Sequence, residues 1–185
     1  LQTLARRSPV KPFVIAEFGF QDGRSGTFEN PVMEEYPYAV STAAFAIHNL
    51  NSGAAGMCIW GLHEVYYPGE KLMNYGLWDF KDNGWKPRPV YHAWAMFTRM
   101  TKAGDRVMRC TSDHPDYVQA AYVNNTLFWV NPSDKKARVI INGAAPQKVR
   151  IMTDRTLFGD RECGTVKPVR NRRFTAPPMS FGYAQ

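Results

Sequence analysis

The hydrophobic pattern of the first hundred residues alternates between short apolar runs and amphipathic segments. The run 13–18 has five apolar residues of six, and the run 56–62 is flanked by glycines. Between them, apolar residues recur at steps of three and four over 40–51, which predicts a helix. A second helix is predicted to begin after Pro89 and to end at Gly104. Strand, helix, strand, helix is typical of parallel α/β units.

The pattern changes beyond Gly104. Short strand-like runs such as DYVQAAYV, TLFWVN, KARVIIN and QKVRIMT follow one another, separated by Asn, Pro, Asp and Gly turns. A hairpin with Asn124 and Asn125 at its tip is expected early in this region. These features predict an antiparallel β-sandwich. We therefore expect two domains, an α/β part over 1–103 and an all-β part over 104–185.

One acidic residue interrupts the first apolar run. We expect that run to form a strand buried on both faces, and burying an ionised carboxylate without a partner is costly. Glu17 stands near the end of the run, Trp60 lies near the end of the second run, and His63 directly follows it. Functional side chains of parallel α/β barrels lie where strands end. A carboxylate beside an indole suits sugar cleavage, because the ring stacks on a pyranose face. The plainer alternatives are a Glu17 ion pair, for example with Arg24, and a Trp60 that only packs the core.

The segments KPFVIAEFG, GMCIWGL, NYGLWD and KPRPVYHAW, in this order and spacing, resemble the end of a known barrel enzyme. They look like the last two strands and helices of the retaining (β/α)8 glycoside hydrolases. That clan includes cellulases, mannanases, β-xylosidases and α-L-iduronidases. The resemblance implies the last two βα units of a (β/α)8 barrel followed by a β-sandwich. It also implies that Glu17 is the catalytic nucleophile and that Trp60 lines the subsite of the cleaved sugar.

The sequence departs from that clan in one respect. The clan's acid/base Glu follows an Asn, and no Asn-Glu pair occurs in the 185 residues. A complete barrel also needs about 250 residues. The expectation is therefore the C-terminal portion of a retaining enzyme, with the acid/base supplied by sequence outside this chain. An N-terminal remainder, covalent or separate, would complete the barrel, and the chain alone should not catalyse.

The loop after the second strand holds further candidates for substrate binding. His63 and Glu64 follow the strand directly, and Tyr66 and Trp78 lie further along an aromatic-rich stretch. A polar rim and ordinary loop packing are the alternatives for these residues. A weaker alternative is that Glu64 acts as a substitute general acid. We expect an oligo- or polysaccharide substrate, and no metal or organic cofactor.

The charge distribution adds one option. The net charge is +7, and basic residues crowd the last forty positions. A solvated surface is the plain explanation, and attraction to an anionic polysaccharide is the sharper one. Nucleic-acid binding is disfavoured because no recognised domain motif accompanies the arginines. No apolar stretch is long enough to span a membrane. A non-catalytic carbohydrate-binding module, with the sandwich as its working part, is the competing function.

Three cysteines complete the chemistry. Cys58, Cys110 and Cys163 have no metal-ligand spacing and leave at least one thiol unpaired. A Cys110–Cys163 bridge is conceivable. The redox compartment is thus undecided from the cysteines. The resemblance implies a secreted or periplasmic protein, because enzymes that degrade polysaccharides are usually exported.

Overall fold

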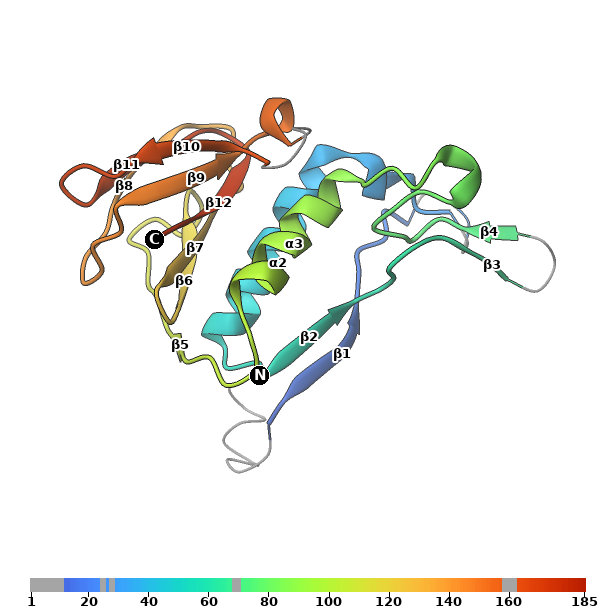
Figure 1. The fold of residues 1–185 in the computed structure, drawn as a ribbon, viewed down its shortest axis with the longest axis horizontal. Coiled ribbons are helices and arrows are strands. Elements are labelled where there is room, and N and C mark those ends of the chain that lie inside the picture. Colours follow the sequence, from blue (N-terminus) through green and yellow to red (C-terminus); the bar gives the residue numbers. More distant parts are fainter. Residues whose placement is uncertain (1–11, 24–25, 27–28, 68–70, 158–162) are drawn as a thin grey trace.

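The protein is built of four layers (Figure 1). The structure, a computed structural model, describes residues 12–23, 26, 29–67, 71–157 and 163–185. A two-stranded parallel sheet forms the first layer and two helices form the second. A six-stranded antiparallel sheet and a two-stranded sheet follow. The prediction of an α/β part followed by an antiparallel part is confirmed by this order of elements.

The first two layers are the predicted strand–helix–strand–helix unit. They consist of β1 (Val14–Phe18), α2 (Tyr36–Asn51), β2 (Gly56–Ile59) and α3 (Pro89–Met100). The strands β1 and β2 pair in parallel, as predicted. The helices begin at or next to prolines, which suit the first turn because they lack an N–H. Phe18 ties the layers together, since its ring stacks on Phe45 at 4.6 Å and meets Trp94 at 5.2 Å.

Strand β1 differs from the expectation of burial on both faces. Phe18 is its one buried residue, and Val14 and Glu17 are exposed. The helices cover one face of the β1–β2 pair, and no described element covers the other. The register shifts by one residue between Ile15 and Phe18, which is a β-bulge in β1.

The loop after β2 contains structure that the sequence pattern did not predict. A short antiparallel ribbon forms from β3 (Val65–Tyr67) and β4 (Lys71–Met73). Two 3-10 turns, η1 (Pro31–Glu34) and η2 (Lys81–Asn83), precede α2 and α3 respectively. Apolar side chains from the loops after β1 and after β2 form a small core with the starts of α2 and α3. This core is centred on Met33, Tyr38, Leu77 and Val90.

The remaining chain forms the predicted antiparallel strands. The larger sheet has the order β10-β9-β12-β7-β6-β5, and β11 pairs with β8. Their bounds are β5 (Val107–Met108), β6 (Gln119–Val123), β7 (Thr126–Asn131), β8 (Ala137–Ile140), β9 (Lys148–Met152), β10 (Thr165–Pro168), β11 (Arg173–Ala176) and β12 (Ser180–Ala184). The predicted hairpin joins β6 to β7, with Asn124 in the left-handed region at φ 49°. The short turn η3 (Asp154–Thr156) follows β9.

The two faces of the larger sheet belong to different cores. On one face Trp129 packs against Phe174 of β11 at 5.1 Å, within a cluster that joins the two antiparallel sheets. On the other face Phe128 packs against Phe97 of α3 at 4.8 Å. That second cluster runs without a break from α2 and α3 to β6, β7 and β12. The domain boundary near residue 103 therefore crosses a continuous core, and it stays a prediction.

Two further expectations concern the whole chain. No described helix is long and apolar enough to cross a membrane. None of the three cysteines forms a disulfide, so the Cys110–Cys163 bridge considered above is not formed. The two residues pack against different clusters, Cys110 beside the core between the antiparallel sheets and Cys163 beside the helical core.

Candidate active site

Glu17 lies at the carboxyl end of β1 and is exposed to solvent. Phe18 is buried against Phe45 and Trp94 of the helices, whereas Glu17 next to it is exposed. No ion pair involving Glu17 occurs among the residues that the structure describes. Arg24, the ion-pair partner considered above, lies outside the described residues. The carboxylate is thus accessible to solvent at the carboxyl end of β1.

Trp60 follows β2 at the same end of the sheet. Its backbone N–H donates to the Phe18 carbonyl at 2.8 Å, which continues the pairing of the two strands by one step. Ile59 is partly buried beside the small core under the loops, whereas Trp60 is 39% exposed. The peptide bond between Trp60 and Gly61 is cis. Neighbouring parallel strands therefore present an exposed carboxylate and an exposed tryptophan at the same end of the pair.

The chain that leaves Glu17 is fixed by two buried side chains that the sequence pattern did not point out. The N–H of Phe20 donates to the Tyr38 hydroxyl at 3.0 Å, and the Phe20 carbonyl accepts from Asn30 Nδ2 at 2.7 Å. Both partners are almost fully buried. Burial raises the pKa of the Tyr38 phenol, so the hydroxyl stays protonated at neutral pH. Tyr38 and Asn30 therefore set the position in which the chain leaves the carboxylate.

His63 and Tyr66 lie on the exposed side of the loop after β2. His63 Nδ1 is 2.6 Å from the Glu64 carbonyl oxygen, and its ring meets the exposed Trp85 edge-on at 5.5 Å. Tyr66 contacts Phe80 edge-on at 5.0 Å and remains half exposed. Their aromatic faces are thus available at the surface, and their place in substrate binding stays a prediction.

Trp78 is held more tightly. Its ring lies 4.8 Å from that of Tyr91 at the start of α3, and it packs at the edge of the small core under the loops. Its backbone also bridges to His63 and to Pro87. Packing accounts for most of the Trp78 surface, and a role at a sugar subsite stays a prediction.

Glu64 occupies a different environment from the one expected. The residue is 2% exposed, its carboxylate is ion-paired with Arg88, and it also accepts the Phe80 N–H at 2.9 Å. Arg88 in turn reaches Asp79 at 3.1 Å and donates to the Gly76 carbonyl at 2.7 Å. The burial of Glu64 and its ion pair with Arg88 favour a structural role. Substrate contact at Glu64 stays a prediction.

Arg88 is a residue that the sequence analysis missed. Its signal lies in the stretch Lys86-Pro87-Arg88-Pro89, where a buried arginine begins α3 at the N-cap position. An arginine flanked by two prolines in an aromatic-rich loop has a fixed backbone. It is therefore suited to a preset ion pair.

Comparison with solved structures places this fold beside carbohydrate-active enzymes. The chain is similar to a glycoside hydrolase family 30 subfamily 8 xylanase from Clostridium acetobutylicum, at a TM-score of 0.62 and 15% identity over 98% of this chain and 44% of that one. It is also similar to a β-porphyranase of glycoside hydrolase family 86 from Bacteroides plebeius, at a TM-score of 0.58 and 14% identity over 99% of this chain and 36% of that one. A bifunctional glucanase-xylanase from a metagenome library is a third similar structure, at a TM-score of 0.60 and 14% identity over 100% of this chain and 33% of that one.

These likenesses define a class of fold and no more. At such low identity they show that the chain has a glycoside hydrolase-like fold. The chain spans less than half the length of each of these structures. Sequence comparison matches no protein-family model and no curated protein.

Proposed function

We propose that the chain is the C-terminal portion of a retaining glycoside hydrolase that cleaves O-glycosidic bonds of an oligo- or polysaccharide. In this proposal β1–α2 and β2–α3 are the last two βα units of a (β/α)8 barrel, and residues 104–185 are the trailing β-sandwich. The parallel pairing of β1 with β2 and the partial coverage of the similar hydrolases support this. The earlier strands and the acid/base carboxylic acid come from sequence outside this chain.

The observation that carries the proposal is the exposure of Glu17 and Trp60 at the same end of the parallel pair β1–β2. Glu17 is a strand-end carboxylate that the described residues leave without an ion pair, which suits a nucleophile better than a structural group. In a retaining reaction Glu17 attacks the anomeric carbon and the glycosidic C–O bond breaks, which leaves a glycosyl ester on Glu17. The second carboxylic acid protonates the departing oxygen and then activates the water that hydrolyses the ester.

The remaining exposed aromatic side chains would hold the sugar. The Trp60 indole stacks on the apolar face of the pyranose whose bond is cleaved. His63 and Tyr66 extend the surface toward a neighbouring subsite, and Trp78 supports it from beneath. No metal or organic cofactor takes part in this mechanism. Export from the cell belongs to the proposal, and one similar structure is a conserved exported protein from Bacteroides fragilis.

The direct test replaces Glu17 by Gln in the protein with its barrel complete. Hydrolysis of xylan, β-glucan and porphyran is measured as reducing-sugar release, because the similar enzymes suggest these polymers. The variant should lose turnover by about three orders of magnitude or more, as expected when a covalent nucleophile is removed. Asp113→Asn is the matched control, since this exposed carboxylate precedes β6 on the antiparallel part. Retention of a tenth of the activity by Glu17→Gln would rule out the nucleophile assignment.

A rescue experiment separates a nucleophile from an acid/base. In Glu17→Ala, azide can enter the space of the lost carboxylate and attack the anomeric carbon in one displacement. The product is then a glycosyl azide of inverted configuration. An azide product of retained configuration would assign Glu17 as the acid/base instead, because azide would have replaced water in the second step.

The competing function, a non-catalytic carbohydrate-binding module, receives no support from the antiparallel part. Such a module would present aromatic rings on an exposed sheet face. Phe128, Trp129 and Phe181 are instead completely buried. Tyr117 is the large aromatic residue that remains exposed in the described part of 104–185, and it lies in a loop.

A further inference from the structure

The two segments that form the last five strands carry positive charge only. Residues 135–153 and 163–185, which contain β8 to β12, hold nine lysines and arginines and no aspartate or glutamate. Four exposed arginines belong to the small β8–β11 sheet and to the turn that leads into β11. They are Arg138, Arg170, Arg172 and Arg173, and we call the surface that they form the arginine face.

The pairing of β8 with β11 brings two of these arginines to the same side of the sheet. Arg138 lies opposite Thr175, and Arg173 lies opposite Ile140. All four residues are exposed, whereas Phe174, between Arg173 and Thr175, is buried in the core that joins the antiparallel sheets. Diagonal neighbours such as Arg138 and Arg173 lie about 7–8 Å apart in an antiparallel pair. The screening length at physiological ionic strength is about 8 Å, so the two charges act together.

The turn before β11 adds two more positive charges. The Arg173 N–H donates to the Arg170 carbonyl at 2.9 Å, and the two residues between them, Asn171 and Arg172, are left-handed at φ 51° and 58°. These angles fit a type I′ turn, whose second central position favours glycine because glycine lacks a Cβ. The Arg172 carbonyl accepts the Ile141 N–H at 2.9 Å, which fixes the turn beside β8. An exposed arginine thus occupies a position where glycine would fit with less strain.

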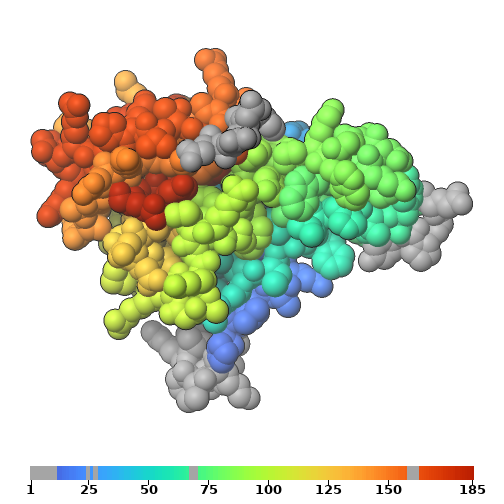
Figure 2. Space-filling view, viewed as in Figure 1, coloured from blue at the N-terminus to red at the C-terminus, as the bar shows by residue number. Residues whose placement is uncertain are grey.

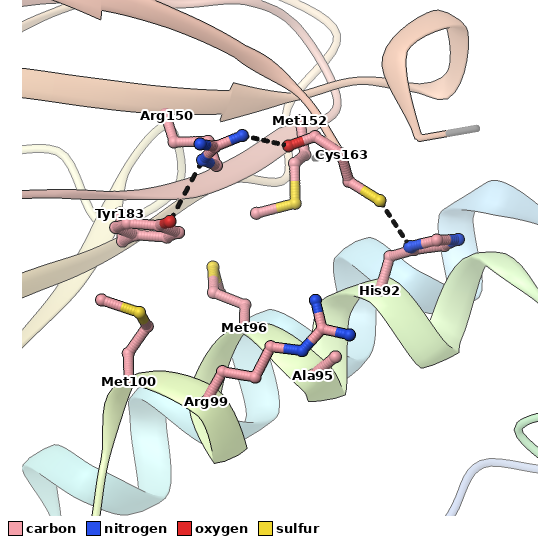
Figure 3. A pocket seen from close by; sticks show the side chains of 9 residues that line it. All are labelled: His92, Ala95, Met96, Arg99, Met100, Arg150, Met152, Cys163 and Tyr183. Atoms are coloured by element: carbon pink, nitrogen blue, oxygen red, sulfur yellow. Dashed lines mark hydrogen bonds between the residues drawn. The ribbon is translucent and has the colours of Figure 1, made fainter. Parts of the chain in front are cut away.

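Arg150 on β9 has a different environment and is not part of the arginine face. It lies on the side of the larger sheet that meets α3. There its Nε donates to the Tyr183 hydroxyl at 3.1 Å and its Nη1 donates to the Cys163 carbonyl at 2.9 Å (Figure 3). The Cys163 thiol in turn lies 2.7 Å from His92 Nδ1. Arg150 thus belongs to the interior contacts between sheet and helix, whereas each arginine of the arginine face is exposed.

We propose that the arginine face binds an anionic polysaccharide through its sulfate or carboxylate groups. A guanidinium matches the oxygens of such a group with two parallel N–H donors. The like charges on the two strands and the turn repel one another, and a polyanion that binds across them relieves this repulsion. A single-stranded nucleic acid fits less well, because Ile140 and Thr175 between the arginines offer no ring on which a base could stack. The inference takes its class of polymer from the proposed function.

Binding is measured with the full chain at pH 7, by the fluorescence anisotropy of labelled polysaccharides. Dextran sulfate and dextran share one backbone and differ in charge, and polygalacturonate carries carboxylates in place of sulfates. At least one of the two polyanions should bind, with an affinity that falls steeply between about 50 and about 200 mM NaCl. The tighter of the two identifies the anionic group that the arginine face prefers. Binding of dextran as tight as that of dextran sulfate, or no binding of either polyanion, would overturn the proposal.

A matched pair of variants separates the arginine face from the net charge of +7, which attracts any polyanion. Arg138→Gln/Arg173→Gln removes two charges from the arginine face. Arg106→Gln/Arg109→Gln removes two exposed arginines beside β5, which lies at the opposite edge of the larger sheet from β10. The two proteins have the same net charge. The first should lose about tenfold in affinity and the second at most about threefold. Equal losses would refute the arginine face as a binding surface.

Arg172→Gly separates binding from folding. Because glycine suits the left-handed position, the melting temperature should stay the same or rise, while the affinity for the polyanion falls by about threefold. Unchanged affinity would contradict the part assigned to the turn. A DNA duplex that displaces the labelled polyanion more readily than the unlabelled polyanion does, at equal charge, would reassign the surface to nucleic acid and overturn the proposal. None of these measurements requires turnover, so they are independent of the nucleophile assignment at Glu17.

Discussion

The ion pair of Glu64 with Arg88 allows a sharp prediction about stability. Replacing Arg88 by Met removes the cation and leaves the Glu64 carboxylate buried without a partner. It also removes the contact with Asp79 and the hydrogen bond to the Gly76 carbonyl. Breaking one side of a buried pair costs about 3–5 kcal/mol. Because 1 kcal/mol shifts the melting temperature of a chain this long by about 2–4 °C, the midpoint should fall by roughly 6–20 °C.

The opposite change should cost much less. Glu64→Gln keeps one acceptor oxygen, enough for either the Phe80 N–H or Arg88 but not for both, and Arg88 keeps Asp79 and the Gly76 carbonyl. We expect a loss of about 1–2 kcal/mol, the size of one weakened charged hydrogen bond. The two variants therefore differ by about 2 kcal/mol or more.

The assay is urea unfolding followed by tryptophan fluorescence, at low salt and at 1 M NaCl. Salt should leave the difference between the variants nearly unchanged, because a buried pair is little screened. The double variant Arg88→Met/Glu64→Leu should be more stable than Arg88→Met alone, since it removes the unpaired carboxylate. The reasoning fails if Arg88→Met costs less than about 1 kcal/mol, or if the double variant is the least stable of all.

Two further predictions concern the junction between the helices and the antiparallel sheet. The Tyr36 hydroxyl donates to the carbonyls of Met179 at 2.8 Å and of Met152 at 3.2 Å, so Tyr36→Phe should cost about 1–2 kcal/mol in urea unfolding near neutral pH. Burial, and to a lesser degree the charge of Asp154, raises the pKa of Tyr36. Its contribution to the free energy of unfolding is therefore complete below pH 10 and is lost at higher pH. A difference in this free energy between wild type and variant that grows above pH 10 would contradict this. A Cβ at position 182 would overlap the Arg150 carbonyl oxygen, so Gly182→Ala should lower the melting temperature. Gly56→Ala is the control for the same thermal scan. Its Cβ would meet a Val14 methyl group at an ordinary 3.6 Å, so the melting temperature should hardly change.

Periodicity was sufficient to predict the helices and the main strands, because their signals are local. The steps of three and four over 40–51 and the proline at 89 are local properties, and α2 and α3 formed where those signals stand. The strands β6 to β12 likewise follow short apolar runs between turn residues. The open face of β1 was not predictable in this way, because burial depends on which other elements cover a strand.

The candidate site was predictable in part. Glu17 and Trp60 were singled out because each stands at the end of an apolar run, and in the structure both are exposed at the same end of the parallel pair. Their part in a catalytic site stays a prediction. The burial of Glu64 was missed, because its partner Arg88 lies 24 residues away and only the folded loop brings the two together. The contact of Cys163 with His92 joins residues 71 apart, which no local pattern reveals.

The small residues of α2 have a consequence for the evolution of this architecture. Ala39, Ala43 and Ala46 are completely buried, so α2 lies close to neighbours on more than one side. The helix layer and the antiparallel sheet therefore share one continuous core, and their atoms lie against one another in the space-filling view (Figure 2). A gene cut at residue 103 would leave the helices with a bare apolar flank, prone to aggregation. The strands β5 to β12 are thus not an independent folding unit, and recombination must transfer them together with the helices α2 and α3.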